Sequence, residues 1–208
     1  MQKALVVDDH PFIRSTVKML LKQEGFEVVA ETDNGVDAVQ LVREHQPELI
    51  LLDIAMPRMD GLEVLSRIAA LGLTSKILIL TSQSPLYYSA RCMKAGAAGY
   101  ISKVDDLSEL IKGIKAVMSG YMYFPNLAVS SVRRSDSEAS EQAMIQSLSD
   151  RELSILQQLA LGMSNKDIGE SMLLSSKTVS TYKTRLIEKL NMKSVVYLAD
   201  FAKRNHLI

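Results

Sequence analysis

The first 120 residues alternate short apolar runs with longer amphipathic stretches, and this alternation constrains the fold more than any other feature. The runs are short and mostly Val, Ile or Leu, as expected for strands that are covered on both faces. They occupy residues 4–7, 27–30, 49–52, 77–80 and 99–101, and helical patterns follow them at residues 12–23, 36–43, 62–69, 86–95 and 107–118. Five such units in succession predict an α/β fold with a doubly wound, five-stranded parallel sheet.

The last third of the chain has helical patterns and no strand pattern. Ser149 followed by Glu152 is a capping signal that opens the first of four short helices, and the others begin near residues 164, 177 and 194. About sixty residues in four short helices have the scale of a helix-turn-helix domain. We therefore expect an all-α, four-helix domain over residues 148–208.

Residues 125–147 separate these two patterns. They contain six serines, two adjacent arginines and scattered acids, without a clean apolar period, although residues 139–145 could form a short turn of helix. Such a composition is typical of a linker, and so long a structureless stretch inside one domain would be unusual. The sequence thus predicts one domain at residues 1–124, a linker at 125–147 and a second domain at 148–208.

Composition narrows the class of protein. The chain has one cysteine, which excludes an internal disulfide framework, and no apolar run long enough to span a bilayer. The N-terminal apolar run is too short for a signal peptide, so we expect a cytoplasmic protein without membrane contact. The 24 basic and 24 acidic residues balance, but residues 1–124 carry a net charge of −2 and residues 148–208 a net charge of +3.

Charged and hydroxyl side chains follow the predicted strands at their carboxyl ends, where ligand sites of such sheets lie. Asp8 and Asp9 follow the first strand, Asp53 the third, Thr81 the fourth and Lys103 the fifth. Taken alone, Asp9 suits a helix cap and Asp53 suits a turn. Together the carboxylates need a compensating cation, and oxygen ligands with vacant positions favour Mg²⁺.

Four segments carry a family resemblance: residues 7–10 (Val-Asp-Asp-His), 52–61, 81–82 and 97–103 resemble the CheY-like receiver domain of two-component response regulators. The resemblance implies that Asp53 is the phosphate acceptor. It also implies that Asp8, Asp9, Asp53 and the main-chain carbonyl of Ala55 hold Mg²⁺. Lys103 would pair with one phosphoryl oxygen and Thr81 with another, while Tyr100 would swing inward as the threonine moves.

Three positions bear on how closely the chain follows the receiver family and on the lifetime of the phosphoryl group. Val104 follows Lys103 where many receivers have proline. Ala55 and Gln83 occupy the positions that, in this family, tune the attack of water on the phosphoryl group. Ala55 has no side chain that orients water, whereas Gln83 could orient it, and on balance we expect a fairly long-lived phosphoryl group. Asp53 as nucleophile of a haloacid-dehalogenase-like phosphatase is a poor alternative, since Ala55 replaces the second acid. A flavin-binding flavodoxin-like protein is equally poor, since Asp8 and Asp9 would repel phosphate. We expect no enzyme beyond self-phosphorylation and slow autodephosphorylation.

The predicted third helix of the second domain has two distinct faces. Val179, Leu186 and Leu190 form its buried face, while small hydroxyl residues lie opposite, near the N-terminal half. Residues 175–193 carry a net charge of +4. This arrangement suits a helix that enters the major groove of DNA, although a solvated polar face would show the same charge.

Residues 148–152, 162–168 and 176–182 resemble the LuxR-type DNA-binding domain. With the receiver, this is the architecture of the NarL/FixJ family, and residues 120–125, 177–186 and 201–205 resemble its BvgA/EvgA subgroup. The expected base contacts are Ser180, Thr181 and Thr184, and the expected phosphate contacts are Lys177, Tyr182, Lys183 and Arg185.

The resemblance implies a phosphorylation-controlled transcriptional regulator. The phosphoryl group would come from a sensor histidine kinase or phosphotransfer domain, of a hybrid sensor in this subgroup. Dimerisation would promote promoter binding, with residues 195–201 supplying a dimer contact, although Leu198 suits the core equally well. A DNA-binding regulator that works without phosphorylation is the alternative.

Overall fold

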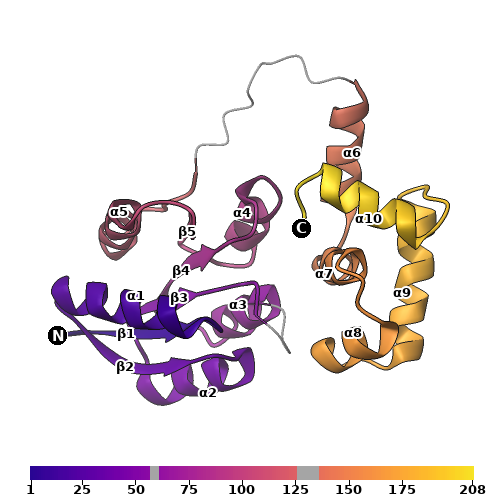
Figure 1. The fold of residues 1–208 in the computed structure, drawn as a ribbon. Coiled ribbons are helices and arrows are strands. Elements are labelled where there is room, and N and C mark those ends of the chain that lie inside the picture. Colours follow the sequence, from indigo (N-terminus) through magenta and orange to yellow (C-terminus); the bar gives the residue numbers. More distant parts are fainter. Residues whose placement is uncertain (57–60, 126–135) are drawn as a thin grey trace. The chain divides into compact units, whose positions relative to one another are not determined.

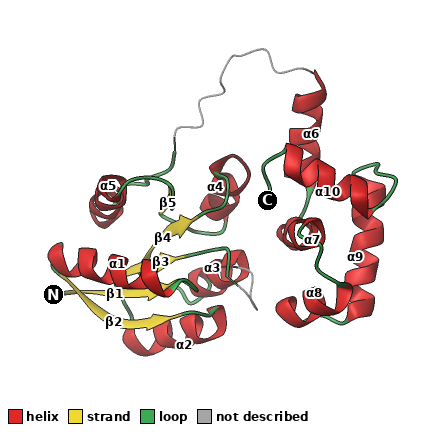
Figure 2. Cartoon of the chain, viewed as in Figure 1, coloured by secondary structure: helices red, strands yellow, loops and turns green. Residues whose placement is uncertain are grey.

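The computed structural model describes residues 1–56, 61–125 and 136–208, with the side chains of 136–140 left out (Figure 1). The chain divides into two compact units, Met1–Asn126 and Leu127–Ile208. The first is an α/β unit and the second is helical, as Figure 2 shows. None of the described helices is long and apolar enough to cross a membrane.

The first unit is a five-stranded parallel sheet in the order β2-β1-β3-β4-β5, with a helix after every strand. This order confirms the predicted doubly wound sheet. The strands are β1 (Gln2–Val7), β2 (Phe26–Thr32), β3 (Leu49–Leu52), β4 (Lys76–Thr81) and β5 (Gly99–Ser102). The helices are α1 (Pro11–Gln23), α2 (Gly35–His45), α3 (Gly61–Ala69), α4 (Pro85–Lys94) and α5 (Leu107–Met118).

The core of this unit lies between the sheet and its flanking helices. Helices α1 and α5 pack on one face, against alternate residues of the strands such as Val6, Leu51 and Leu80. All four residues of the central strand β3 are buried, because helices cover both faces of the sheet. The parallel register pairs Val7 with Leu52 and Thr81 with Ser102, and so it aligns the carboxyl ends of β1, β3, β4 and β5.

A close approach of backbone segments follows β3. A Cβ atom at Gly61, the first residue of α3, would overlap the Cα atom of Ile54 and would lie 2.9 Å from the carbonyl oxygen of Asp53. No side chain fits at these distances, so the start of α3 packs directly on the backbone that carries Asp53. Glycine at this position therefore helps to fix the end of the third strand.

The second unit contains α6 (Asp136–Ser147), α7 (Asp150–Ala160), α8 (Asn165–Met172), α9 (Ser176–Lys189) and α10 (Val195–Arg204). Ser149 and Ser164 cap α7 and α8 through capping boxes with Glu152 and Asp167. The predicted buried face of α9 is confirmed, since Val179, Leu186 and Leu190 are all buried.

Helix α6 is longer than the short turn of helix that the sequence allows at residues 139–145 of the predicted linker. Among its described side chains only Ile145 is buried, so the apolar pattern is too weak to predict the full helix. Polar contacts hold α6 instead: the Glu141 carboxylate accepts a hydrogen bond from Arg204 at 2.7 Å and another from Asn205 at 2.7 Å. The structure thus places a helix over the second half of the predicted linker.

Gly169 is the basis of a prediction about the stability of the second unit. A Cβ atom at Gly169 would lie 2.6 Å from the carbonyl oxygen of Leu174, in the turn between α8 and α9. Because this contact is with backbone, Gly169→Ala must displace the turn, and we expect it to destabilise the unit by about 1–3 kcal/mol. Thermal unfolding of the full chain measures the loss.

The neighbouring variant Glu170→Ala provides the control, because Glu170 is exposed on the same helix. Its effect should stay within about 0.5 kcal/mol. Equal stability of Gly169→Ala and Glu170→Ala would contradict the close approach of α8 to the turn.

Candidate metal centre and nucleic-acid interface

Three strands bring Asp8, Asp53 and Lys103 together at the carboxyl edge of the sheet. The Nζ atom of Lys103 lies 2.6 Å from Oδ2 of Asp53 and 2.7 Å from Oδ2 of Asp8. Backbone hydrogen bonds extend the sheet to these residues, since Asp53 N donates to Val7 and Lys103 N donates to Thr81, each at 2.8 Å. The contact between residues 8, 53 and 103 is therefore a direct result of the parallel register.

These charged side chains are buried. Asp53 has a side-chain exposure of 0% and Lys103 of 10%. The second oxygen of each carboxylate accepts a backbone hydrogen bond at 2.8 Å, from Ala55 N to Asp53 and from His10 N to Asp8. Burial by itself would lower the pKa of Lys103, but the adjacent carboxylates of Asp53 and Asp8 raise it above its ordinary value.

Asp9 adds a third carboxylate beside this pair. Its Oδ1 atom is buried and accepts no hydrogen bond, although Nδ1 of His10 lies 2.6 Å away. Asp8, Asp9, His10 and Asp53 each offer one ligand atom, and these atoms lie within 4.8 Å of one another. Three carboxylates, one of which has a buried oxygen without a hydrogen-bond partner, fit a hard divalent cation such as Mg²⁺. The predicted role of the Ala55 carbonyl stays a prediction.

Thr81 and Tyr100 lie beside the acidic cluster and are joined through the loop after β4. Thr81 is fully buried, and its hydroxyl accepts a hydrogen bond from Gln83 N at 3.4 Å. Tyr100 is 1% exposed, and its hydroxyl donates to the carbonyl oxygen of Gln83 at 2.6 Å. Burial raises the pKa of the Tyr100 phenol. The Tyr100 ring thus points inward and holds this loop.

Arg14 is a residue of this site that the sequence analysis missed. Its Nη1 atom donates a 2.7 Å hydrogen bond to the carbonyl oxygen of Asp8, and its Nε lies 3.7 Å from Glu31 on β2. Lys18 also pairs with Glu31, at 2.8 Å. These contacts fix the loop between β1 and α1, which carries Asp8 and Asp9. The sequence shows only an arginine one turn into α1, and the fold decides where its side chain points.

Helix α9 carries all the predicted DNA-contact residues, and five of them lie on one exposed face. Lys177, Ser180, Thr181, Thr184 and Arg185 are exposed, while Tyr182 and Lys183 are half-buried. The hydroxyls of Thr181 and Thr184 donate to backbone carbonyls one turn earlier, at 3.1 and 3.2 Å, and so their oxygens can still accept hydrogen bonds.

A polar contact sets the position of α9 on α7. The Nζ atom of Lys189, at the end of α9, lies 2.9 Å from Oε2 of Glu152. The same carboxylate oxygen accepts a hydrogen bond from Ser149 N at 2.7 Å in the capping box of α7. Burial by itself would raise the pKa of Glu152, but the Lys189 ammonium and the Ser149 hydrogen bonds hold it below its ordinary value. Glu152 thus joins the start of α7 to the end of α9.

Comparison with known proteins covers both units. The family "Response regulator receiver domain" matches residues 4–115, and the family "Bacterial regulatory proteins, luxR family" matches residues 146–202. The chain is 53% identical over 205 residues to the virulence-factor transcription regulator BvgA of Bordetella pertussis, covering 99% of this chain and 98% of the relative. It is 37% identical over 204 residues to the DNA-binding transcriptional activator EvgA of Escherichia coli, covering 98% of each.

Solved structures agree with this fold. RcsB of Salmonella enterica, bound to promoter rprA with the phosphomimetic BeF₃⁻, matches with a TM-score of 0.71 at 20% identity. The match covers 96% of this chain and 97% of that chain. A LuxR-family response regulator of Aurantimonas matches with a TM-score of 0.56 at 30% identity, over 68% of this chain and 94% of that chain.

The ion pairs of Lys103 lead to a prediction about stability. Lys103→Met removes the cation between two buried carboxylates, so we expect a loss of about 3–5 kcal/mol in chelator-treated protein. Mg²⁺ should raise the melting temperature of the variant more than that of the parent chain, because the ion replaces the missing positive charge. Thermal unfolding with and without Mg²⁺ measures both effects.

The raised pKa of Lys103 fixes the pH window of this loss. A group whose pKa is raised on folding stabilises the protein fully below its unfolded pKa, here near 10.5, and the contribution is lost as pH rises through the higher folded value. The deficit should therefore stay constant between about pH 7 and pH 9. Lys22→Met on the exposed side of α1 is the control, and equal Mg²⁺ responses of the two variants would refute the prediction.

Proposed function

Because the chain belongs to the response regulators that join a receiver domain to a LuxR-family DNA-binding domain, and is a phosphorylation-controlled transcriptional regulator, we propose that Asp53 is its phosphoacceptor. The observation that carries this proposal is the buried contact of Lys103 with Asp53 and Asp8 at the carboxyl edge of the sheet. Asp53 directly follows the central strand β3 and lies close to Lys103 and to the other two carboxylates of the site.

The chemistry follows from the positions of the side chains. A carboxylate oxygen of Asp53 attacks phosphorus, the bond between phosphorus and the donor's histidine nitrogen breaks, and the electron pair leaves with that nitrogen. Asp8, Asp9, Asp53 and the Ala55 carbonyl would hold Mg²⁺, which when bound offsets the negative charge of the phosphoryl oxygens. Lys103 is already held at a carboxylate oxygen of Asp53, and it would pair with a phosphoryl oxygen as a point charge.

Thr81 supplies the response to phosphorylation. Its hydroxyl is buried at the end of β4 and would hydrogen-bond a phosphoryl oxygen, which fixes the loop that reaches Gln83. The inward Tyr100 ring would hold that loop in its new place. Ala55 offers no side chain that could orient water, and the phosphoryl group is accordingly long-lived, with slow autodephosphorylation as the only turnover.

Helix α9 is the proposed reading element for double-stranded DNA. Ser180, Thr181 and Thr184 contact base edges in the major groove, and cations and a tyrosine around them contact phosphates. These phosphate contacts are Lys177, Tyr182, Lys183 and Arg185. The exposure of the hydroxyl residues and of Lys177 and Arg185 supports this assignment.

Helix α10 supplies the proposed homodimer contact on DNA. Val196 and Tyr197 are 69% and 50% exposed, whereas Leu198 and Phe201 are buried in the core of the unit. Within residues 195–201 we therefore assign the dimer contact to the two exposed apolar side chains, Val196 and Tyr197. A dimer on an inverted repeat places half-sites about 34 Å apart, or a multiple of this distance.

The remaining parts of the proposal follow from the family resemblance. The phosphoryl donor is a sensor histidine kinase or phosphotransfer domain of a hybrid sensor, and the protein acts in the cytoplasm. The receiver spans residues 1–124, the linker 125–147 and the DNA-binding domain 148–208. The helix α6 then serves as the part of the linker that adjoins α7.

The phosphoacceptor is tested with the full chain, acetyl phosphate and Mg²⁺. We expect a mass increase of about 80 Da, the mass of one phosphoryl group, which Asp53→Asn abolishes. Asp33→Asn, at an exposed loop position, should retain the adduct. An adduct that persists in Asp53→Asn would move the phosphoacceptor elsewhere, and a chain that never gains mass would overturn the proposed function.

The DNA contacts are tested on a duplex selected by the phosphorylated chain from a random-sequence pool. Thr181→Ala should lose about 1–3 kcal/mol of discrimination between the selected duplex and single-base variants of it. Lys183→Ala should weaken binding to all duplexes alike and reduce the salt dependence. Lys203→Ala, at the end of α10, is the control. Uniform weakening by Thr181→Ala would exclude a base contact at that position.

A further inference from the structure

Residues 121–125, here named the strap, follow α5 and lie along the edge strand β5. Tyr123 N donates to the carbonyl oxygen of Ala98 at 3.0 Å, and Tyr100 N donates to the carbonyl oxygen of Tyr123 at 2.7 Å. These hydrogen bonds make a parallel bridge between Gly99 and Tyr123. The strap therefore occupies the open edge of the sheet, and the receiver ends on a hydrogen-bonded segment instead of leaving directly from α5.

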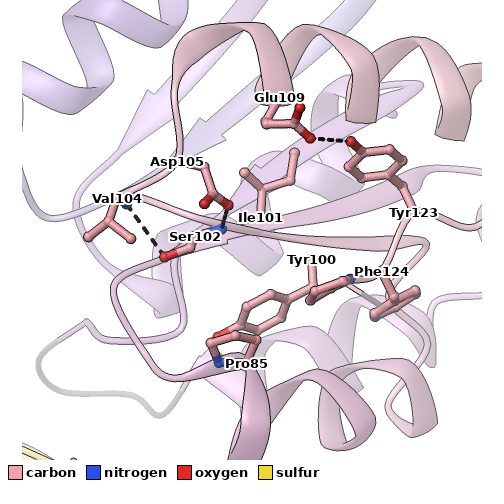
Figure 3. Close-up of a pocket in the computed structure, with 10 residues that line it drawn as sticks. Pro85, Tyr100, Ile101, Ser102, Val104, Asp105, Glu109, Tyr123 and Phe124 are labelled. Atoms are coloured by element: carbon pink, nitrogen blue, oxygen red, sulfur yellow. Dashed lines mark hydrogen bonds between the residues drawn. The ribbon is translucent and has the colours of Figure 1, made fainter. Parts of the chain in front are cut away.

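The packing around Tyr123 requires small residues on β5 and α5 and a hydrogen-bond acceptor for its hydroxyl. A Cβ atom at Gly99 would lie 2.8 Å from the carbonyl oxygen of Tyr123, and one at Gly113 of α5 would lie 3.2 Å from its ring. The Tyr123 hydroxyl donates to Oε2 of Glu109 at 2.5 Å (Figure 3). Lys112 pairs with the other oxygen of Glu109 at 2.6 Å. Two glycines and one carboxylate thus make room for this tyrosine and hold it.

Hydrogen bonds through Gln83 and Tyr100 connect the strap to Thr81, at the end of the strand beside the acidic site. The Thr81 hydroxyl accepts from Gln83 N, and the Gln83 carbonyl accepts from the Tyr100 hydroxyl. The backbone N–H of the same Tyr100 donates to Tyr123. A change at Thr81 therefore reaches, through two residues, the last anchored tyrosine before the chain leaves the first unit.

A pocket of about 450 Å³ beside the strap gives this series room to move. Pro85, Tyr100, Ser102, Glu109, Tyr123 and Phe124 line it, from α4, β5, α5 and the strap (Figure 3). In a closely packed core, a side chain or backbone segment cannot move without displacing its neighbours. Here Tyr100 and the strap border open space, so both can shift without repacking the core between α1, α5 and the sheet.

We propose that Tyr123 is a positioning residue that couples the phosphorylation state of Asp53 to the DNA-binding unit, by docking the strap on β5 when Tyr100 is held inward. This proposal rests on the proposed function. A phosphoryl group that fixes Thr81 and Gln83 stabilises the inward Tyr100, and the docked strap fixes the point at which the connection to the second unit begins. Loss of docking leaves phosphoryl transfer intact but disconnects it from DNA binding.

The first test compares Tyr123→Ala and Tyr123→Phe with Tyr121→Ala in the full chain. Tyr121 is a neighbouring tyrosine that is 72% exposed. Phosphoryl uptake from acetyl phosphate and affinity for the selected duplex are measured on the same samples. Typical couplings between two sites raise affinity about 5- to 150-fold. Tyr123→Ala should keep wild-type uptake and lose most of the affinity gain, Tyr123→Phe should lose part of it, and Tyr121→Ala should keep it.

The second test follows hydrogen exchange of the Tyr100 and Tyr123 amides by NMR, with Mg²⁺ and beryllofluoride as the phosphoryl mimic. Both amides should exchange several-fold more slowly with beryllofluoride in the wild type and show no change in Asp53→Asn. This arm also decides the matter if Tyr123→Ala fails to fold.

The outcomes separate the two levels of the proposal. A wild-type affinity gain in Tyr123→Ala, or amide exchange at Tyr123 that ignores beryllofluoride, overturns the role of the strap. A wild-type chain that takes up phosphate without any gain in DNA affinity overturns the proposed function instead, while the exchange of the Tyr123 amide still reports whether the strap responds to the site.

Discussion

The ion pairs of Lys103 with Asp8 and Asp53 are the interaction on which the first unit depends. Two carboxylates about 4 Å apart repel by roughly 4 kcal/mol at an effective dielectric of 20, and a buried pair needs a cation. The chain supplies this cation from β5, two strands away from β3. A shift of register between any of these strands would separate the charges, so the same contact that prepares the chemistry also fixes the alignment of the sheet.

The position of Lys103 directly after the edge strand β5 has a structural consequence. Exposed strand edges invite pairing with other chains, and proteins cover or charge them. Here the strap covers the edge with the chain itself, and Gly99 permits the close approach. The strand that carries Lys103 therefore contacts the acidic site at its end and the start of the interdomain connection along its side. Site and connection therefore share one element of the sheet.

The sequence predicts the strands and helices of the first unit to within two residues, because helices cover both faces of the sheet and the apolar period is strong. The meeting of Asp8, Asp53 and Lys103 also follows, since parallel strands end at one edge. The sequence predicts only a short turn within α6, because Ile145 is the one buried side chain among those described there and polar contacts of Glu141 supply the other support. Arg14 was missed for a related reason: its hydrogen bond to the Asp8 carbonyl depends on the direction of one side chain, which no residue pattern encodes.

Polar anchors of this kind recur where the two units meet the connection between them. On the receiver side the last anchor is Tyr123, held by Glu109 and by the backbone of β5. On the other side Glu141 of α6 binds Arg204 and Asn205 at the end of α10. Each such hydrogen bond contributes only about 1 kcal/mol of net stability, and ordering the side chain that makes it costs conformational entropy. These polar contacts therefore break more readily than the packing of an apolar core. Anchors of modest strength at both described ends suit a connection that must change state, because a phosphoryl group supplies only a few kcal/mol of coupling.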